Sequence, residues 1–222
     1  MHIGLIAGIG PAATDFYYRG LIERHAASGV PLELTMAHAD VREMSRNLVG
    51  RNPGRQAEIF AGLVRRMKAA GAQAAAITSM GGHFCVNELI ALSPLPVLNA
   101  IPAVDTALAQ GKFRKIGILG TRTVMESKLY GGIPSVEVVP TEGEALDLVH
   151  DNYVAMATIG HVTDVQRGVF LDAGRKLCAR GAEAIMLGGT DLFLAFAGHD
   201  PGFPVIDCAD IHVDAIYAKS AA

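Results

Sequence analysis

The stretch Gly71-Ala-Gln-Ala-Ala-Ala-Ile-Thr-Ser79 returns in related form as Gly181-Ala-Glu-Ala-Ile-Met-Leu-Gly-Gly189. The two copies begin 68 and 65 residues after two similar apolar runs, Ile3-Gly-Leu-Ile-Ala-Gly8 and Ile116-Gly-Ile-Leu-Gly120. Each copy also follows a basic segment, where Lys and Arg suit a helix end and the glycine suits a left-handed C-cap. A GAxA run alone is common in α/β proteins, but two matched features at matched spacing indicate a duplicated unit of about 100 residues, a usual domain size.

Short apolar runs alternate along the chain with longer segments of helical spacing, for example Ile59, Leu63, Val64 and Met67. This alternation predicts an α/β fold, in which helices cover both faces of a parallel sheet. The expected strands are His2–Gly8, Leu32–His38, Ala72–Ser79, Pro96–Leu98, Lys115–Gly120, Val136–Val139, Ala184–Gly188 and Val205–Asp207.

The composition excludes several classes of protein. Of 222 residues, 50% are apolar and 18% are charged, with a formal net charge of −3, so there is no basic footprint for a nucleic acid. No signal peptide or apolar run of membrane-spanning length is visible. The three cysteines, Cys85, Cys178 and Cys208, have no CxxC spacing, which argues against a disulfide framework and a zinc site. We expect a soluble, cytoplasmic protein that binds neither nucleic acid nor membrane.

Four expected strands end in loops rich in Gly, Ser or Thr, each directly before a helix. We call residues 8–14, 79–83, 120–126 and 188–191 the strand-end loops. Ligands of parallel α/β sheets bind beyond the carboxyl ends of the strands, and backbone N–H groups at helix starts favour carboxylate or phosphate. The spacing fits neither GxGxxG nor a P-loop, so a small acid is favoured over a nucleotide. The duplication places Ser79 and Gly189 at equivalent positions.

These loops resemble motifs of the cofactor-independent aspartate/glutamate racemase family. Gly8-Ile-Gly-Pro-Ala-Ala-Thr-Asp-Phe-Tyr17 is similar to the family's GGMGPxATxxFY opening, and Leu119-Gly-Thr-Arg-Thr-Val-Met-Glu126 with Tyr130 is similar to LGTRxTMExxxY. Residues 181–191 resemble GAExVILGCTE, and Asp207 with Ile211-His212 resembles the closing FDTxxIHA. The likeness extends from residue 3 to about residue 216.

The resemblance implies two flavodoxin-like units with parallel sheets, related by pseudo-twofold symmetry, with a ligand cleft between them. We expect residues 1–98 with 208–222 to form the first unit and residues 99–207 the second. The C-terminal segment then returns to the first unit. The resemblance also implies a homodimer and an amino-acid or small carboxylate ligand handled without pyridoxal phosphate or any other cofactor.

Family members use two cysteine thiols on opposite faces of the substrate, and this chain departs from that pattern. The first cysteine motif, CNTAH, falls on Ser79-Met-Gly-Gly-His83, and the second, GCTE, falls on Gly188-Gly-Thr-Asp191. Neither cysteine is present at these positions. A serine hydroxyl needs an adjacent base and a glycine offers none, so two-thiol racemisation is not expected.

Other residues are candidates for the chemistry and for binding. His83, Ser79 and Asp191 are the expected catalytic residues, because imidazole titrates near neutrality and a carboxylate can act as a base. His83 also suits a packing role and Asp191 a helix cap. The resemblance places Arg42 or Arg46 about where the family has a carboxylate-binding Arg, which a solvated helix face explains equally well. It places His161 where some members carry a substrate-contacting Lys after Gly160. The expected substrate-binding residues are Gly8, Gly10, Arg46, Gly81, Gly82, Thr121, Thr123, His161, Gly189 and Thr190.

Three functions are consistent with these features. The first is a racemase-family enzyme with altered chemistry, such as an isomerase, decarboxylase or lyase acting on a small acid. The second is a non-catalytic ligand-binding descendant. The third, a serine hydrolase built on Ser79, is the least favoured because no G-x-S-x-G elbow surrounds that residue.

Overall fold

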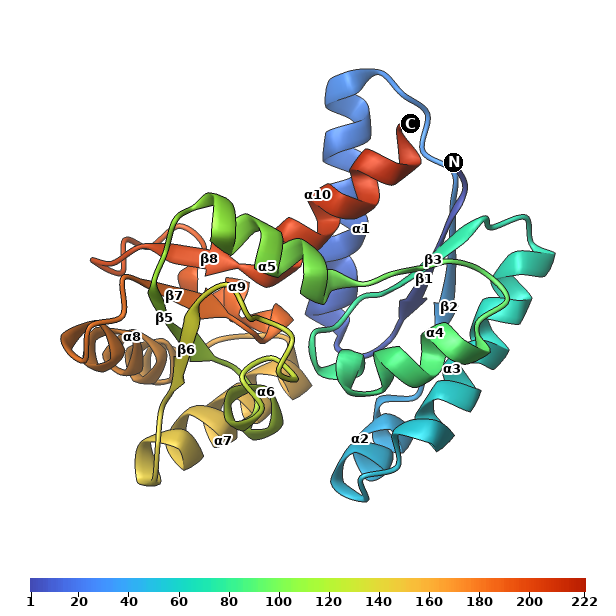
Figure 1. Cartoon of the computed structure of the whole chain (residues 1–222). Helices are drawn as coiled ribbons and strands as arrows, with labels where there is room; N and C mark the ends of the chain where they lie inside the picture. Colours follow the sequence, from blue (N-terminus) through green and yellow to red (C-terminus); the bar gives the residue numbers. More distant parts are fainter. The chain divides into compact units, whose positions relative to one another are not determined.

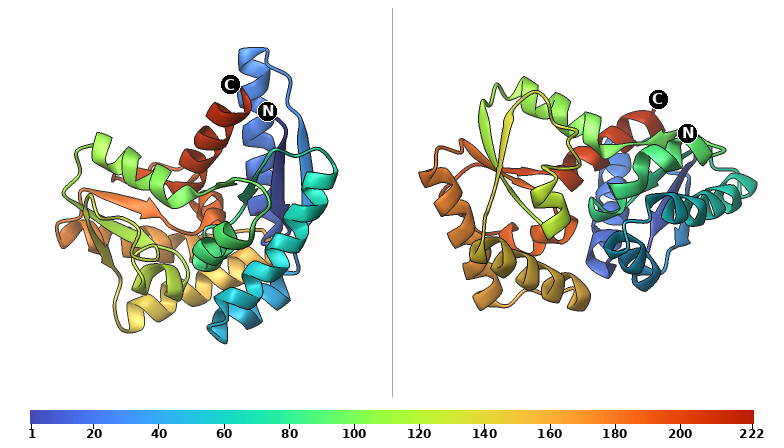
Figure 2. Two further views of the ribbon diagram at one scale, coloured as in Figure 1. Left: turned by 45° about the vertical axis from the view of Figure 1, so that its right-hand side comes forward. Right: turned by 60° about the horizontal axis from the view of Figure 1, so that its bottom comes forward.

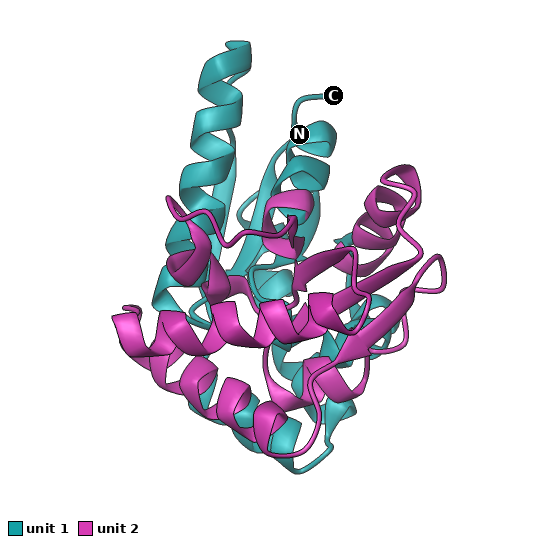
Figure 3. Ribbon diagram, turned by 90° about the vertical axis from the view of Figure 1, so that its left-hand side faces the viewer, with its two compact units in different colours: residues 1–99, 212–222 teal, residues 100–211 magenta.

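The computed structural model describes residues 1–222 and divides into two compact units (Figure 3). Unit 1 consists of residues Met1–Asn99 and His212–Ala222, and unit 2 consists of residues Ala100–Ile211. These bounds differ from the expected ones at residue 99, which lies in unit 1, and at residues 208–211, which lie in unit 2. Each unit carries its own four-stranded parallel sheet (Figure 1).

Unit 1 is built on a sheet of order β2-β1-β3-β4. Its central strands are short runs of apolar residues and glycine, which suits strands covered on both faces. The strands are β1 (Ile3–Ala7), β2 (Leu34–His38), β3 (Ala74–Ile77) and β4 (Val97–Leu98). The helices are α1 (Pro11–Ser28), α2 (Val41–Val49), α3 (Pro53–Ala69), the 3-10 helix η1 (Gly81–Cys85) and α4 (Val86–Leu92).

Unit 2 repeats this arrangement with the sheet order β6-β5-β7-β8. The strands are β5 (Lys115–Leu119), β6 (Glu137–Pro140), β7 (Ala184–Leu187) and β8 (Val205–Asp207). The helices are α5 (Ala100–Gln110), α6 (Arg122–Glu126), α7 (Glu144–Ile159), α8 (Asp164–Ala179), the 3-10 helix η2 (Thr190–Leu192) and α9 (Phe193–Phe196). No helix of either unit combines the length and the apolar character that crossing a membrane requires.

The strand register confirms the internal repeat. Ile3 pairs with Ala74 in unit 1, and Ile116 pairs with Ala184 in unit 2, so the matched stretches occupy matching places in the two sheets. All eight expected strands are present, and each observed end lies within two residues of its predicted position. The predicted α/β class and the two flavodoxin-like units are therefore confirmed.

Each sheet carries a glycine where a helix crosses it closely. A Cβ added at Gly4 of β1 would lie 2.9 Å from the sulfur of Met67, and one added at Gly117 of β5 would lie 2.9 Å from Cδ1 of Leu177. Met67 and Leu177 belong to α3 and α8, the helices that precede the two GAxA stretches. The absence of a side chain at these glycines thus allows each helix to approach its sheet.

The end of the chain returns to unit 1, as expected. Helix α10 (Cys208–Ser220) runs beside α1 in both views of Figure 2. Arg24 of α1 forms an ion pair of 2.6 Å with Asp214, and Nε2 of His25 lies 2.8 Å from the hydroxyl of Ser220. The amino terminus donates to the carbonyl of Ser220 at 2.6 Å, so both chain ends are held by unit 1.

Candidate functional site

The first strand-end loop of unit 1 depends on glycine. Gly8 has φ of 87°, and a Cβ added there would lie 2.4 Å from Nδ1 of His38, so both the backbone and the space require glycine. The Gly8 N–H donates to the hydroxyl of Thr14 at 3.0 Å, and that hydroxyl donates to the carbonyl of Gly10 at 3.0 Å. The loop is therefore closed onto the first turn of α1 (Figure 1).

The second loop of unit 1 follows the neighbouring strand β3 and holds Ser79 and His83. The Ser79 hydroxyl accepts a long hydrogen bond of 3.4 Å from the Gly82 N–H. Nδ1 of His83 donates to the Ser79 carbonyl at 2.7 Å, because a carbonyl oxygen can only accept. This imidazole nitrogen therefore fixes the backbone of the loop and does not bond to the Ser79 hydroxyl.

His83 lies in a buried aromatic cluster with His212 and Tyr17. The two imidazole rings meet edge to face, with centroids 5.5 Å apart. Nε2 of His212 donates to the Leu98 carbonyl at 2.8 Å, so Nδ1 accepts from the Tyr17 hydroxyl, also at 2.8 Å. Burial lowers the pKa of His83 to about 4 and that of His212 to about 3, where nearby His83 contributes further. Both rings are consequently neutral near neutral pH.

In unit 2, the loop after β5 begins helix α6 with a capping threonine. The Thr121 hydroxyl accepts from the Val124 N–H at 3.4 Å, and Thr123 lies half-buried in the first turn. The guanidinium of Arg122 pairs with Asp147 of α7, and its backbone N–H donates to Nδ1 of His150 at 3.1 Å. This loop is therefore fixed to α7 by two contacts.

The loop after β7 contains two buried polar residues. Thr190 is 1% exposed and Asp191 is 3% exposed. The hydroxyl of Tyr153, on α7, donates to Oδ2 of Asp191 at 3.1 Å. Burial, together with the charge of Asp191, raises the pKa of Tyr153 well above its usual value, so the phenol keeps its proton. Tyr153 was not among the residues expected from the sequence, because no motif marks it.

A left-handed turn follows α6. Lys128, Leu129 and Tyr130 have φ of 52°, 57° and 60°, and Gly131 continues the turn with φ of 68°. For residues other than glycine this conformation costs about 1–2 kcal/mol each. The turn brings Tyr130 close enough that its phenol contributes to the raised pKa of Tyr153. Backbone strain of this kind persists where surrounding contacts enforce it, often at functional sites.

Two of the expected binding residues are exposed. Arg46 lies on the exposed side of α2, and His161 directly follows Gly160, which ends α7 with φ of 72°. Gly81 and Gly82 lie in η1, within the loop that carries Ser79. The structure thus groups the expected residues into a cluster in each unit and leaves these two side chains in solvent.

The three cysteines are shielded from water to different degrees. Cys85 and Cys208 are buried and Cys178 is half-buried. Burial raises the pKa of the Cys85 thiol to about 12 and also raises those of Cys178 and Cys208. Since the thiolate is the reactive form, none of the three is activated for proton transfer or nucleophilic attack.

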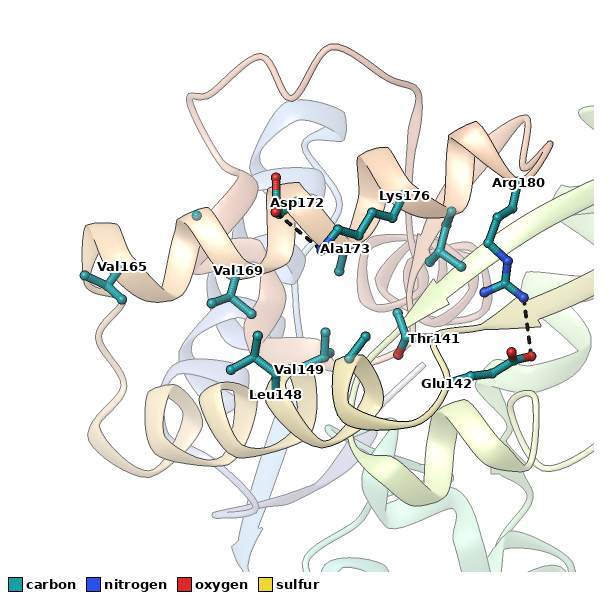
Figure 4. Close-up of a pocket in the computed structure, with 13 residues that line it drawn as sticks. Thr141, Glu142, Leu148, Val149, Val165, Val169, Asp172, Ala173, Lys176 and Arg180 are labelled. Atoms are coloured by element: carbon teal, nitrogen blue, oxygen red, sulfur yellow. Dashed lines mark hydrogen bonds and ion pairs between the residues drawn. The ribbon is translucent and has the colours of Figure 1, made fainter.

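A groove of unit 2 lies away from the strand-end loops. It has a volume of about 530 Å³ and runs between α7 and α8, where Leu148, Val149, Val165 and Val169 face one another (Figure 4). Arg180 pairs with Glu142 at one end. None of its lining residues belongs to the strand-end loops.

The chain is similar to proteins of one family, both in sequence and in structure. A profile of the family described as Asp/Glu/Hydantoin racemase matches residues 6–216. A Yersinia pestis protein assigned as an Asp/Glu racemase is 25% identical, with a TM-score of 0.86 and full coverage of both chains. An aspartate racemase homologue from Pyrococcus horikoshii OT3 is 24% identical, with a TM-score of 0.80, covering 100% of this chain and 99% of the other.

A third solved structure is more distant in sequence. The glutamate racemase of Francisella tularensis, solved in complex with D-glutamate, is 14% identical with a TM-score of 0.68, covering 98% of this chain and 80% of the other. At this identity the likeness concerns the fold.

Proposed function

The chain belongs to the Asp/Glu/hydantoin racemase family, and on that premise we propose that it binds a small amino or carboxylic acid at its strand-end loops and converts it by chemistry other than two-thiol racemisation. The observation that carries the proposal is the pair of equivalent positions, Ser79 and Gly189. They end matching strands in matching units, and neither offers a thiol. The reaction needs no pyridoxal phosphate, and its class is isomerase, decarboxylase or lyase.

Backbone donors of the strand-end loops supply the binding of the acid. A helix start carries a partial positive charge, which favours a carboxylate. Arg46 and His161, being exposed, are available for a second carboxylate of the ligand. The proposed binding residues are Gly8, Gly10, Arg46, Gly81, Gly82, Thr121, Thr123, His161, Gly189 and Thr190.

Among the three candidates for proton transfer, Asp191 is best supported. It lies just beyond a strand end, and the protonated phenol of Tyr153 donates to one of its carboxyl oxygens, which orients the side chain. His83 is neutral near neutral pH and occupied at Nδ1 by a backbone carbonyl, which supports a role in shaping the loop around Ser79. A single acid–base residue can serve these reactions, since elimination and isomerisation begin with the removal of one α-proton and decarboxylation ends with the delivery of one proton to the carbon that has lost CO₂.

A non-catalytic ligand-binding protein is the second candidate. The Ser79 hydroxyl accepts from the Gly82 N–H, and Nδ1 of His83 donates to the Ser79 carbonyl, so this ring nitrogen does not serve the hydroxyl as a base. This favours a loop that binds without reacting. The two candidates differ in whether a bound acid loses its α-proton or carboxylate.

The test is a panel of amino and dicarboxylic acids followed by two measurements. Thermal unfolding reports binding, and NMR in D₂O reports α-proton exchange, loss of carboxylate or a new product. Exchange or turnover that Asp191→Asn abolishes while binding persists supports the enzyme. Stabilisation without any turnover favours the binding protein, and no stabilisation by any acid contradicts both.

A further inference from the structure

Gly189 lies two residues after the end of strand β7 and has an ordinary extended backbone conformation. Its φ is −111° and its ψ is 123°, which any residue adopts in an extended segment. Unlike Gly8, this position does not need glycine for its dihedral angles. The reason for glycine must therefore be space.

Tyr153 of α7 fills that space. A Cβ built on Gly189 would lie 2.3 Å from Cε2, 2.7 Å from Cζ and 2.9 Å from the hydroxyl oxygen of Tyr153. Contacts this short do not occur between real side chains. The Tyr153 side chain is 7% exposed, so the ring has little room to swing aside without disturbing its neighbours.

The same ring also reaches the acidic residue of the loop. Its hydroxyl donates to Oδ2 of Asp191 at 3.1 Å, and its raised pKa keeps it a donor. One side chain thus excludes any substituent at residue 189 and fixes the carboxylate two residues later.

We propose that Tyr153 replaces the side chain that residue 189 lacks: its ring occupies the space beside Gly189, and its hydroxyl positions Asp191. The exclusion of a side chain at residue 189 stands on geometry alone. The positioning of Asp191 for chemistry rests on the proposed function. Tyr153 is a positioning residue, since it acts on the ligand through Asp191.

The space is tested by adding side chains at residue 189. Gly189→Ala and Gly189→Cys should each lower the midpoint of thermal unfolding, the cysteine variant by roughly 5–10 °C, as overpacking predicts. Gly168→Ala is the matched control, because a Cβ there meets nothing within 4 Å. In a Tyr153→Leu background, which lacks the three clashing atoms, adding Gly189→Cys should change the midpoint by less than about 2 °C. Equal losses in both backgrounds would overturn the proposal, as would a Gly189→Ala variant as stable as wild type.

The positioning is tested by removing the hydroxyl alone. With an acid that the wild type turns over, Tyr153→Phe and Asp191→Asn should each slow the reaction, and the double variant should be no slower than Asp191→Asn. Tyr18→Phe, an exposed tyrosine of α1, is the control. If the two losses instead multiply in the double variant, the positioning role is contradicted. A tyrosine with a purely structural role would give this result, because its effect on the rate would not depend on Asp191.

The two failures are distinguishable. If no acid is bound or turned over by the wild type, the proposed function fails while the thermal series at residue 189 still decides the packing claim. If turnover is found and the rate losses of the two single variants multiply in the double variant, the proposed function stands and the positioning role of Tyr153 is wrong.

Discussion

Equivalent strand ends in the two units are completed by different means. In unit 1, Ser79 keeps its own side chain, and His83 fastens the loop to a buried cluster with His212 and Tyr17. In unit 2, Gly189 has no side chain, and Tyr153 reaches in from a neighbouring helix to take the space and bind Asp191. A duplicated backbone thus preserves a position while the group that occupies it comes from elsewhere in the chain.

The buried polar groups of the two units also differ in kind. The cluster of unit 1 is made of neutral groups that exchange hydrogen bonds with each other and with backbone carbonyls. Unit 2 holds its carboxylate with a protonated phenol. The first arrangement is sensitive to added protons, and the second depends on one hydroxyl.

Acidification should therefore affect the two units with opposite sign, and this is the largest effect that we expect. The pKa values of His83 and His212 are lowered to about 4 and about 3. Their contribution to the free energy of unfolding of unit 1 is therefore complete above the unfolded-state pKa near 6.5 and is lost as pH falls toward 4. In unit 2, burial raises the pKa of Asp207 to about 6. Its contribution to the free energy of unfolding of unit 2 is therefore complete below pH about 3.9, the unfolded-state pKa, and is lost as pH rises through about 6.

Native-state hydrogen exchange, corrected for the intrinsic pH dependence, measures each unit separately. Between pH 7 and pH 4, unit 1 should lose several kcal/mol of protection. Asp207→Asn should remove the opposing trend in unit 2 while leaving unit 1 unchanged. Equal protection of unit 1 at both pH values would contradict the assignment of neutral histidines.

The next largest effect concerns the cluster in unit 1. His212→Leu removes the buried hydrogen bonds of His212 to the Tyr17 hydroxyl and to the Leu98 carbonyl, and each loss costs about 1–3 kcal/mol. Urea unfolding should show a total loss of about 2–6 kcal/mol. The matched change in unit 2, Tyr153→Phe, removes one hydroxyl from an acceptor and should cost about 1–3 kcal/mol.

The double variant Tyr17→Phe with His212→Leu is the control for this prediction. Since the hydroxyl is then absent, the double loss should be smaller than the sum of the two single losses. Strictly additive losses would show that the hydrogen bond between the two side chains contributes nothing.

The packing of helix on sheet gives a smaller difference. Gly4→Ala directs its methyl group toward the flexible side chain of Met67, whereas Gly117→Ala meets Cδ1 and Cβ of Leu177 and Cδ1 of Ile185. Overpacking typically costs about 1–3 kcal/mol, and we expect Gly117→Ala near the upper end and Gly4→Ala near the lower end. Thermal unfolding of the two variants checks the order, and the reverse order would contradict it.

The smallest effect separates two surface ion pairs. Arg24 to Asp214 joins α1 to α10 in unit 1 with a half-buried guanidinium, whereas the Arg114 side chain paired with Glu183 in unit 2 is 90% exposed. Exposed pairs contribute little because water and salt screen them. Arg24→Met should cost about 1 kcal/mol or less, and Arg114→Met should be neutral within the error of urea unfolding.

The position of the strand-end loops in the fold could largely be predicted from the sequence, whereas few of the contacts of their side chains could. Ser79 and Gly189 were placed at equivalent strand ends by spacing alone, and the structure confirms the register that this requires. Thr121 caps a helix, as a threonine before a helical segment suggests. The roles of Arg46 and His161 stay predictions, because an exposed cation has no local signal that separates binding from solvation.

The sequence by itself determined the repeated α/β unit, because apolar periodicity, glycine C-caps and strand spacing are local properties that adjacent residues encode. Only the tertiary structure decided what completes each strand end. Tyr153 meets Asp191 across 38 residues, and Tyr17 meets His212 across 195. Such contacts follow from how helices pack on a sheet, and packing is a property of three-dimensional space that no spacing along the chain records.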